Sequence, residues 1–213
     1  INAAYSGMED SDSDHWSHGY WYWNQRDVYN SFFASNHTDM MKTFLNLYVR
    51  NQETLKAETE KRFGFEGIYV PETMNWDGMA SGLSNNTRTL YSTAAEVAQN
   101  LYNVYQYTND LAYLRDTAYP FMREAARFYV NMLSYDSETG EYYMAESNAH
   151  ETYYNVQNAL TDLAAVRTLF PNTIAAGELL GMEEDAGLYA QLQEILDHLA
   201  PYPLSEDGSE YLP

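Results

Sequence analysis

The sequence of 213 residues contains no cysteine, which excludes both a disulfide framework and a thiolate-ligated metal site. Basic residues are also scarce, because 11 Lys and Arg stand against 31 Asp and Glu and give a formal net charge of −20. Nucleic acids and anionic membrane surfaces are bound through clustered Lys and Arg. Apolar runs of the ~20 residues that a membrane helix needs are missing as well. We therefore expect neither nucleic acid nor a membrane as a partner.

Aromatic residues are abundant, with 21 tyrosines and 4 tryptophans, and hydrophobic residues make up 45% of the chain. That hydrophobic share is enough to build a core. Tyr and Trp combine a flat apolar face with a polar edge, which suits the rings and hydroxyl groups of sugars. The alternative is that these side chains fill the space between helices, and we expect this for most of them.

The N-terminal segment has features of metal sites. Residues 10–14 carry aspartates at alternate positions, as the first ligands of a calcium loop do. However, His15 occupies the position of the sharp-turn glycine and Trp21 that of the bidentate glutamate. His15 and His18 are spaced to share a metal, but a third ligand is not evident. We predict neither a metal nor a cofactor.

Apolar residues recur at spacings of three and four along most of the chain, which predicts helices joined by short turns. Pro171 is placed at the first position of a helix of its own. The predicted helices cover residues 26–34, 39–63, 85–110, 110–136 with a break near Pro120, 156–170, 171–181 and 183–200. Paired helices of this kind predict a mainly α fold, an (α/α)6 toroid or a portion of one. Six or seven helices are too few to close a twelve-helix ring, so we expect residues 1–213 to be a single helical domain within a larger catalytic domain.

Residues 142–156, YYMAESNAHETYYNV, are the strongest candidate site. Glu146 and Glu151 lie five apart, with His150 between them and tyrosines on both sides. One interpretation is a carboxylate site held in an aromatic pocket. The other is the polar start of a helix, with Asn148 as its cap and Glu151 returning to the backbone as in a capping box. The residues alone favour the second interpretation.

A second candidate lies in residues 70–78, VPETMNWDG, which we expect to be extended. Trp76 offers a stacking platform for a sugar, and Glu72 and Asp77 offer acceptors for its hydroxyl groups. The alternative is an ordinary Asp-Gly turn beside a packed tryptophan.

Four segments in order resemble the catalytic domain of family 95 glycoside hydrolases, the α-L-fucosidase-like enzymes. They are AESN (145–148), VRTLF (166–170), AAGELLG (175–181) and HLAPYPLSEDG (198–208). Residues 20–48 resemble the first inward helix of that family, which begins with an N-x-N motif. The match is close over about seventy residues of the C-terminal third and looser over the rest.

The resemblance implies an (α/α)6 barrel and inverting hydrolysis of a glycosidic bond in a glycan that ends in L-fucose or L-galactose. It implies that Glu146 is the general acid and that Asn24, as the second asparagine of the motif, helps to activate water. The chain departs from the family where Tyr22 replaces the first asparagine and Ala145 replaces the proline before the glutamate. The family's water-activating aspartate lies in a later helix, so we expect the remainder of a longer chain as a partner.

Inverting hydrolysis needs an acid and a base ~6.5–9.5 Å apart, and the acid's pKa must be raised by its surroundings. We expect Glu146 to face a hollow walled by tyrosines from positions 142–143 and 153–154, with Glu151 as the alternative acid. The residues predicted to bind substrate are Trp23, Glu72, Trp76, Asp77, His150 and Glu151.

Two other functions remain open: a non-catalytic helical module that binds glycans or acts as a scaffold, and a disaccharide phosphorylase on a related toroid. The class of substrate suggests a secreted, periplasmic or cell-surface protein.

Overall fold

A computed structural model describes residues 19–82, 84 and 86–213 of the chain. The aspartates of residues 10–14, His15 and His18 lie outside the described residues. The described part is mainly α-helical, as predicted. Its helices are α1 (Tyr22–Tyr29), α2 (Ser31–Ala34), α3 (Thr38–Val49), α4 (Gln52–Phe63), α5 (Thr93–Thr108), α6 (Leu111–Tyr113), the π-helical segment η1 (Leu114–Ala118), α7 (Tyr119–Met132), α8 (Leu160–Leu180), the short 3-10 turn η2 (Glu183–Asp185) and α9 (Ala186–Asp197).

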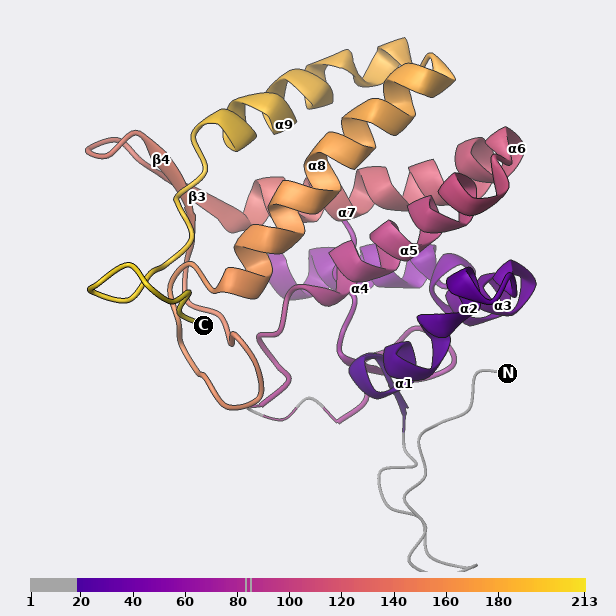
Figure 1. Cartoon of the computed structure of the whole chain (residues 1–213), viewed down its shortest axis with the longest axis horizontal. Coiled ribbons are helices and arrows are strands. Elements are labelled where there is room, and N and C mark those ends of the chain that lie inside the picture. Colours follow the sequence, from indigo (N-terminus) through magenta and orange to yellow (C-terminus); the bar gives the residue numbers. More distant parts are fainter. Residues whose placement is uncertain (1–18, 83, 85) are drawn as a thin grey trace, which may run out of the picture.

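The longer helices form two layers. In one layer, α5 packs beside both α3 and α8. α7 forms the other layer and packs against α5 and α8, while α9 packs against α8 and more lightly against α7. In Figure 1, α5 and α8 run in the same general direction in front of α7, and both begin at the lower left. The N-terminal ends of α5 and α8 therefore lie at one edge of the molecule.

The core between these layers follows the predicted periodicity. Val97, Leu101 and Val104 of α5 are fully buried, and so are Phe121 and Phe128 of α7. Aromatic side chains supply much of this core, since ring pairs such as Phe63–Phe128 and Tyr69–Phe128 lie 5.4 and 5.7 Å apart. Buried tyrosines are found at positions 22, 29, 48, 69, 91, 102, 119 and 129.

The helix predicted for residues 39–63 is two helices, α3 and α4, separated at residues 50–51. The amide nitrogen of Asn51 donates to the carbonyl oxygen of Leu47 at 2.8 Å and to that of Trp76 at 3.0 Å. A side-chain amide bonded to the backbone in this way competes with continued helix. The later end is as predicted, because α4 stops at Gly64, whose φ of 80° is unfavourable for other residues.

The separate helix expected to start at Pro171 is not formed, because α8 runs through this residue (Figure 1). Proline removes one backbone donor from a helix and ordinarily bends or ends it. Here the residues on either side keep packing: Phe170 and Thr173 are both fully buried. This packing on both sides of Pro171 outweighs the local signal.

Four short strands complete the fold. β1 (Tyr20–Trp21) pairs antiparallel with β2 (Thr73–Met74), and β3 (Leu133–Asp136) forms a hairpin with β4 (Glu141–Met144). The first pair brings residues 72–74 directly against the start of α1. Within the described ranges, none of the helices combines the length and apolar character of a membrane span.

Candidate functional site

Three segments distant in sequence meet at the edge where α1, α5 and α8 begin (Figure 1). The first is the β1–α1 junction, the second is the segment from Glu72 to the start of α5, and the third is the loop of residues 145–159 before α8. The backbone nitrogen of Asn148 donates to the carbonyl oxygen of Thr89 at 3.0 Å, and that of Tyr22 donates to Glu72 at 2.9 Å. These bonds join the three segments into one surface, which we take as the candidate site.

Glu72 lies beneath this surface rather than on it, with only 2% of its area exposed. Its Oε1 accepts a hydrogen bond from the backbone nitrogen of Trp23 at 2.8 Å, and its Oε2 accepts one from the Thr93 hydroxyl at 3.2 Å. Burial raises the pKa of Glu72 to about 8, against the opposing effect of these two donors. The carboxyl group joins the first turns of α1 and α5, and its burial leaves no open oxygen for the predicted contact with a sugar hydroxyl.

The rings of Trp23 and His150 lie together, with their centroids 4.6 Å apart. The guanidinium carbon of Arg26 stands 4.8 Å from the centroid of the same indole ring, and Nη1 of Arg26 pairs with Glu96 at 2.5 Å. Trp23, predicted to bind substrate, is therefore held between a histidine and an arginine. Asn24 follows Trp23 in α1 and is exposed.

The loop of residues 145–159 contains no helix, and α8 begins only at Leu160. The capping-box interpretation is therefore wrong. The side chain of Asn148 instead donates to the carbonyl oxygen of Asn86 at 3.2 Å and accepts from the backbone nitrogen of Asn155 at 3.4 Å. Ser147 and Val156 exchange two backbone hydrogen bonds of 3.0 and 2.8 Å across the loop. The loop is thus fastened to itself and to residues 86–89.

Glu146 is exposed, although the next two residues, Ser147 and Asn148, are buried. A wall of tyrosines enclosing Glu146, as predicted, would bury this side chain, and its exposure contradicts such a wall. Tyr142 lies on β4 and packs against Tyr135 with ring centroids 5.0 Å apart, while the side chains from positions 153 and 154 are 52% and 47% exposed. The apolar surroundings that an acid of this kind requires are not provided by these tyrosines.

Trp76 and Asp77 lie in the turn after β2. Oδ1 of Asp77 accepts from the backbone nitrogen of Met79 at 3.1 Å, which is the ordinary Asp-Gly turn named as the alternative. The carbonyl oxygen of Trp76 accepts from Arg50 and Asn51, each at 3.0 Å, while its indole ring is 68% exposed. Trp76 is exposed, so its predicted role as a stacking platform stays a prediction, and the aspartate is engaged in the turn. Glu151 is half-buried, and its backbone oxygen accepts from the Tyr154 hydroxyl.

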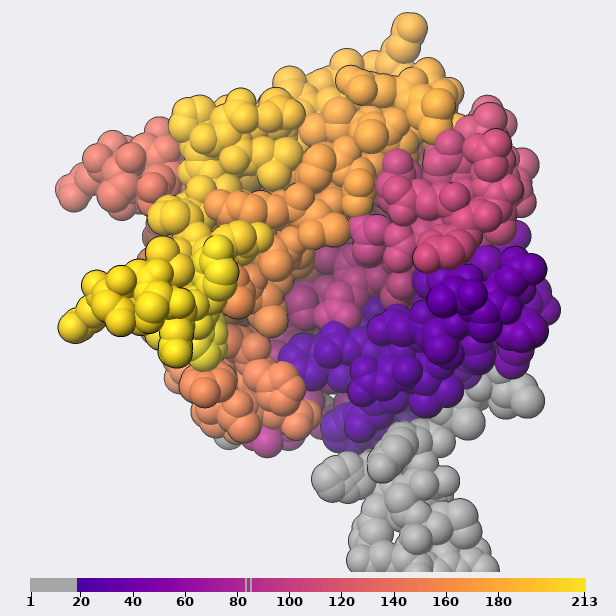
Figure 2. All heavy atoms as spheres, in the orientation of Figure 1, coloured from indigo at the N-terminus to yellow at the C-terminus, as the bar shows by residue number. Residues whose placement is uncertain are grey.

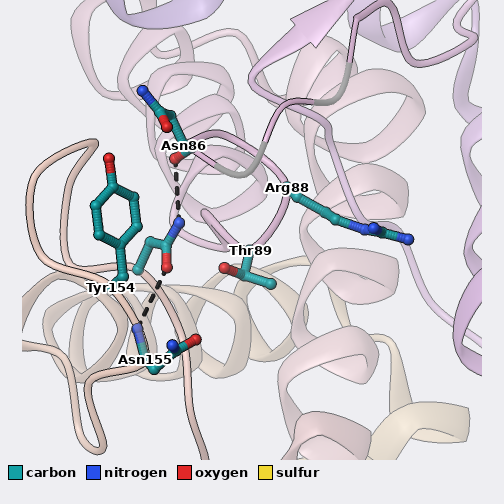
Figure 3. A pocket seen from close by; sticks show the side chains of 6 residues that line it. Asn86, Arg88, Thr89, Tyr154 and Asn155 are labelled. Atoms are coloured by element: carbon teal, nitrogen blue, oxygen red, sulfur yellow. Dashed lines mark hydrogen bonds between the residues drawn. The ribbon is translucent and has the colours of Figure 1, made fainter.

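A polar pocket of about 670 Å³ lies between residues 86–89 and the loop of residues 145–159 (Figure 3). Figure 3 shows Tyr154 and Asn86 on facing sides of it, with Asn155 and Thr89 below and the Arg88 guanidinium turned away. Its lining residues are Asn86, Arg88, Thr89, Asn148, Tyr154 and Asn155. Sequence reasoning placed residues 86–89 inside a helix and so missed this pocket. The sequence signal for an irregular loop was the presence of several asparagines, because asparagine adopts positive φ more readily than most residues. Asn155 and Asn158 indeed have φ of 55° and 57°.

A second cavity of about 390 Å³ opens on the face formed by α5, α8 and the end of α1. Figure 2 shows this face hollowed, with the atoms of α5 lying deep between those of α8 and the N-terminal helices. Its polar lining includes Asn30, Glu96, Gln99 and Asn100. Among the residues that the structure describes, no group of three or more potential ligands of a metal comes together.

The described helices pack as layered pairs, with polar loops gathered at one edge. A structure titled "Putative kojibiose phosphorylase from human microbiome" superposes with a TM-score of 0.62 at 13% sequence identity, over 80% of this chain and 25% of that one. This likeness confirms the predicted portion of an α/α toroid, and the chain spans about a quarter of that protein's length.

The family follows from a second comparison. The profile of the glycosyl hydrolase family 95 catalytic domain matches residues 9–211, so the chain belongs to this family, as its sequence segments indicated. A search of curated proteins found no matching relative.

Proposed function

We propose that this chain is part of an inverting glycoside hydrolase that removes terminal α-L-fucose or α-L-galactose from glycans. One observation carries the proposal: the contact between Trp23 and His150 holds the loop with Glu146 against the first turn of α1, which contains Asn24. The two residues assigned to catalysis by resemblance therefore belong to neighbouring segments of one surface. Residues 1–213 act as a single helical domain within a longer catalytic domain.

In this proposal Glu146 donates the proton to the oxygen of the leaving group, and Asn24 orients the attacking water. An acid must be protonated when the bond breaks, so its carboxyl has to be desolvated. Glu146 is exposed in the described part of the chain, so the desolvation comes from the bound substrate and from the rest of the polypeptide. The base that activates water comes from the same remaining region.

The polar pocket beside the loop suits the sugar units on the leaving side of the bond. Its lining consists of amide and hydroxyl groups with one aromatic ring, the groups that pair with sugar hydroxyls and stack on sugar rings. Trp76 provides a second, more exposed ring for a distal part of the glycan. A glycan substrate of this kind is met outside the cytoplasm, and we propose a secreted, periplasmic or cell-surface location.

The test uses the full-length protein with 4-nitrophenyl α-L-fucoside and α-L-galactoside. We expect turnover in the absence of phosphate and release of the sugar with inverted configuration, followed by ¹H NMR. On an oligosaccharide, whose leaving sugar alcohol needs protonation, Glu146→Gln should lower kcat by ~10²–10⁴-fold, the usual contribution of general acid–base catalysis, with a smaller loss on the 4-nitrophenyl glycosides. Glu151→Gln tests the alternative acid, and Glu138→Gln, which removes an exposed carboxylate from the turn between β3 and β4, is the control and should change kcat little.

Other results favour the remaining functions. Turnover that requires phosphate, with a sugar phosphate as product, indicates a phosphorylase. Sugar binding without any turnover by the full-length protein indicates a non-catalytic module. Equal activity of the wild type and the Glu146→Gln variant on an oligosaccharide removes Glu146 as the acid.

A further inference from the structure

A second carboxyl group lies under the loop of residues 145–159, and sequence reasoning gave it no role. Asp162 occupies the first turn of α8 and is 1% exposed. Its Oδ2 accepts a hydrogen bond from the hydroxyl of Ser147 at 2.5 Å. Its Oδ1 is buried and has no hydrogen-bond partner among the described residues. Burial raises the pKa of Asp162 to about 7, while the bond from Ser147 acts in the opposite direction.

The partner of Asp162 is the residue that follows Glu146. Ser147 is fixed at three points, because its backbone exchanges two hydrogen bonds with Val156 and its hydroxyl is held by Asp162. A bond of 2.5 Å lies at the short end of the range for a hydroxyl donating to a carboxylate, where such bonds are strongest. The side-chain contact is therefore the link between the loop and α8 at this position.

The other side of Glu146 is also fastened. The backbone nitrogen of Met144 donates to Oδ1 of Asn158 at 2.9 Å, and the backbone nitrogen of Asn158 donates to the carbonyl oxygen of Met144 at 3.0 Å. Glu146 is thus an exposed side chain on a backbone whose neighbours are held from below. A catalytic acid needs such support, since displacement by about 1 Å lowers rates substantially.

We propose that Asp162 is a positioning residue for Glu146, acting through the hydroxyl of Ser147 to fix the direction in which the acid projects. Asp162 is too deeply buried to touch substrate, so its effect on the reaction passes through the loop. This inference rests on the proposed function of Glu146. It assigns a reason for keeping a carboxyl group at the start of α8, where burial with one oxygen unbonded is costly.

The experiment is a double-mutant cycle in the full-length protein, made from Asp162→Ala, Glu146→Gln and the double variant. The kcat of each is measured on an oligosaccharide, whose leaving sugar alcohol needs protonation. We expect Asp162→Ala to lower kcat by ~10–100-fold with little change in KM, because misplacing a catalytic group impairs the transition state more than binding. In the Glu146→Gln background the same change should lower kcat less than ~2-fold, since the acid is already lost and effects within one unit are not additive.

Two further variants keep the test readable if Asp162→Ala folds poorly. Ser147→Ala deletes only the hydroxyl and should reproduce the loss in kcat per folded molecule, with a fall in melting temperature because Oδ2 of Asp162 loses its donor. Asp162→Asn retains an oxygen that accepts from Ser147 and should keep kcat within ~5-fold of the wild type.

The results separate this inference from the function it rests on. If Glu146→Gln itself leaves kcat unchanged, both the acid role and the positioning role are overturned. If Glu146→Gln is impaired but Asp162→Ala lowers kcat by the same factor in both backgrounds, the acid role stands and the positioning role is overturned. Full activity of Ser147→Ala would likewise overturn the positioning role and leave the acid role standing.

Discussion

The indole ring of Trp23 lies 4.6 Å from the imidazole ring of His150, measured between their centroids, at an interplanar angle of 37°. This contact joins the first turn of α1 to the loop of residues 145–159. Both residues were predicted to bind substrate, and the structure shows that they also bind each other. Their contact is the direct physical connection between the segments that contain Asn24 and Glu146.

Replacing His150 tests whether this ring contact matters for activity. His150→Ala removes the ring and should lower kcat/KM by ~10-fold, because stacked rings contribute ~0.5–1.5 kcal/mol beyond their buried area. His150→Phe keeps a ring and should retain most of the activity, measured with the same aryl glycosides. If His150→Phe is as impaired as His150→Ala, the imidazole nitrogens act on the substrate and the contact is secondary.

The polar pocket predicts a difference between two adjacent tyrosines. Tyr154 lines the pocket, while Tyr153 is comparably exposed and does not. Tyr154→Ala should raise KM for an oligosaccharide by several-fold and leave KM for an aryl glycoside unchanged, because only the longer substrate reaches the pocket. Tyr153→Ala is the control and should change neither value. Equal effects of both substitutions on the oligosaccharide would place its binding elsewhere.

Glu72 predicts a dependence of stability on pH. Its pKa is raised to about 8 in the folded chain and is near 4.5 in the unfolded chain, so the folded state binds the proton more tightly. The stabilisation is complete below about pH 4.5 and is lost as the pH rises through 8. Glu72→Gln removes this titration, so its melting temperature should fall less between pH 5 and pH 9 than that of the wild type. Identical falls, measured by scanning calorimetry, would mean that Glu72 does not carry this effect.

Two helical glycines predict opposite effects on stability. A Cβ at Gly177 of α8 would lie 1.9 Å from the hydroxyl oxygen of Tyr189, which bonds to Tyr119 at 2.6 Å. Gly177→Ala should therefore lower the melting temperature. A Cβ at Gly187 of α9 meets nothing within 4 Å, so Gly187→Ala should stabilise by up to ~1 kcal/mol through helix propensity. A stable Gly177→Ala variant would mean that Tyr189 can move without cost.

The helices could be predicted from the sequence because each one has apolar residues at spacings of three and four within its own segment. Two boundaries could not be predicted in this way. The amide of Asn51 ends α3 through a bond to residue 76, which is distant in sequence, and the packing of Phe170 and Thr173 carries α8 through Pro171. Both depend on tertiary contacts that outweigh local signals.

The family resemblance was enough to predict where in the sequence the candidate site lies. The arrangement of its side chains could be predicted much less well. The segment AESN marked the loop, but the sequence suggested a helix cap at Asn148, where the structure has a bond to Asn86. The role of Asp162 was hidden because a first-turn aspartate is ordinarily a surface residue that complements the helix dipole. Its burial depends on the path of the loop above it.

Whether Glu146 is the acid can be decided from how activity depends on the leaving group. Fluoride departs without protonation, while a sugar alcohol needs it. If Glu146 is the acid, Glu146→Gln retains most of its turnover of an α-L-glycosyl fluoride, and its kcat on a natural disaccharide falls ~10²-fold or more. Equal losses on both substrates would contradict it, because the glutamate would then serve a step other than proton donation.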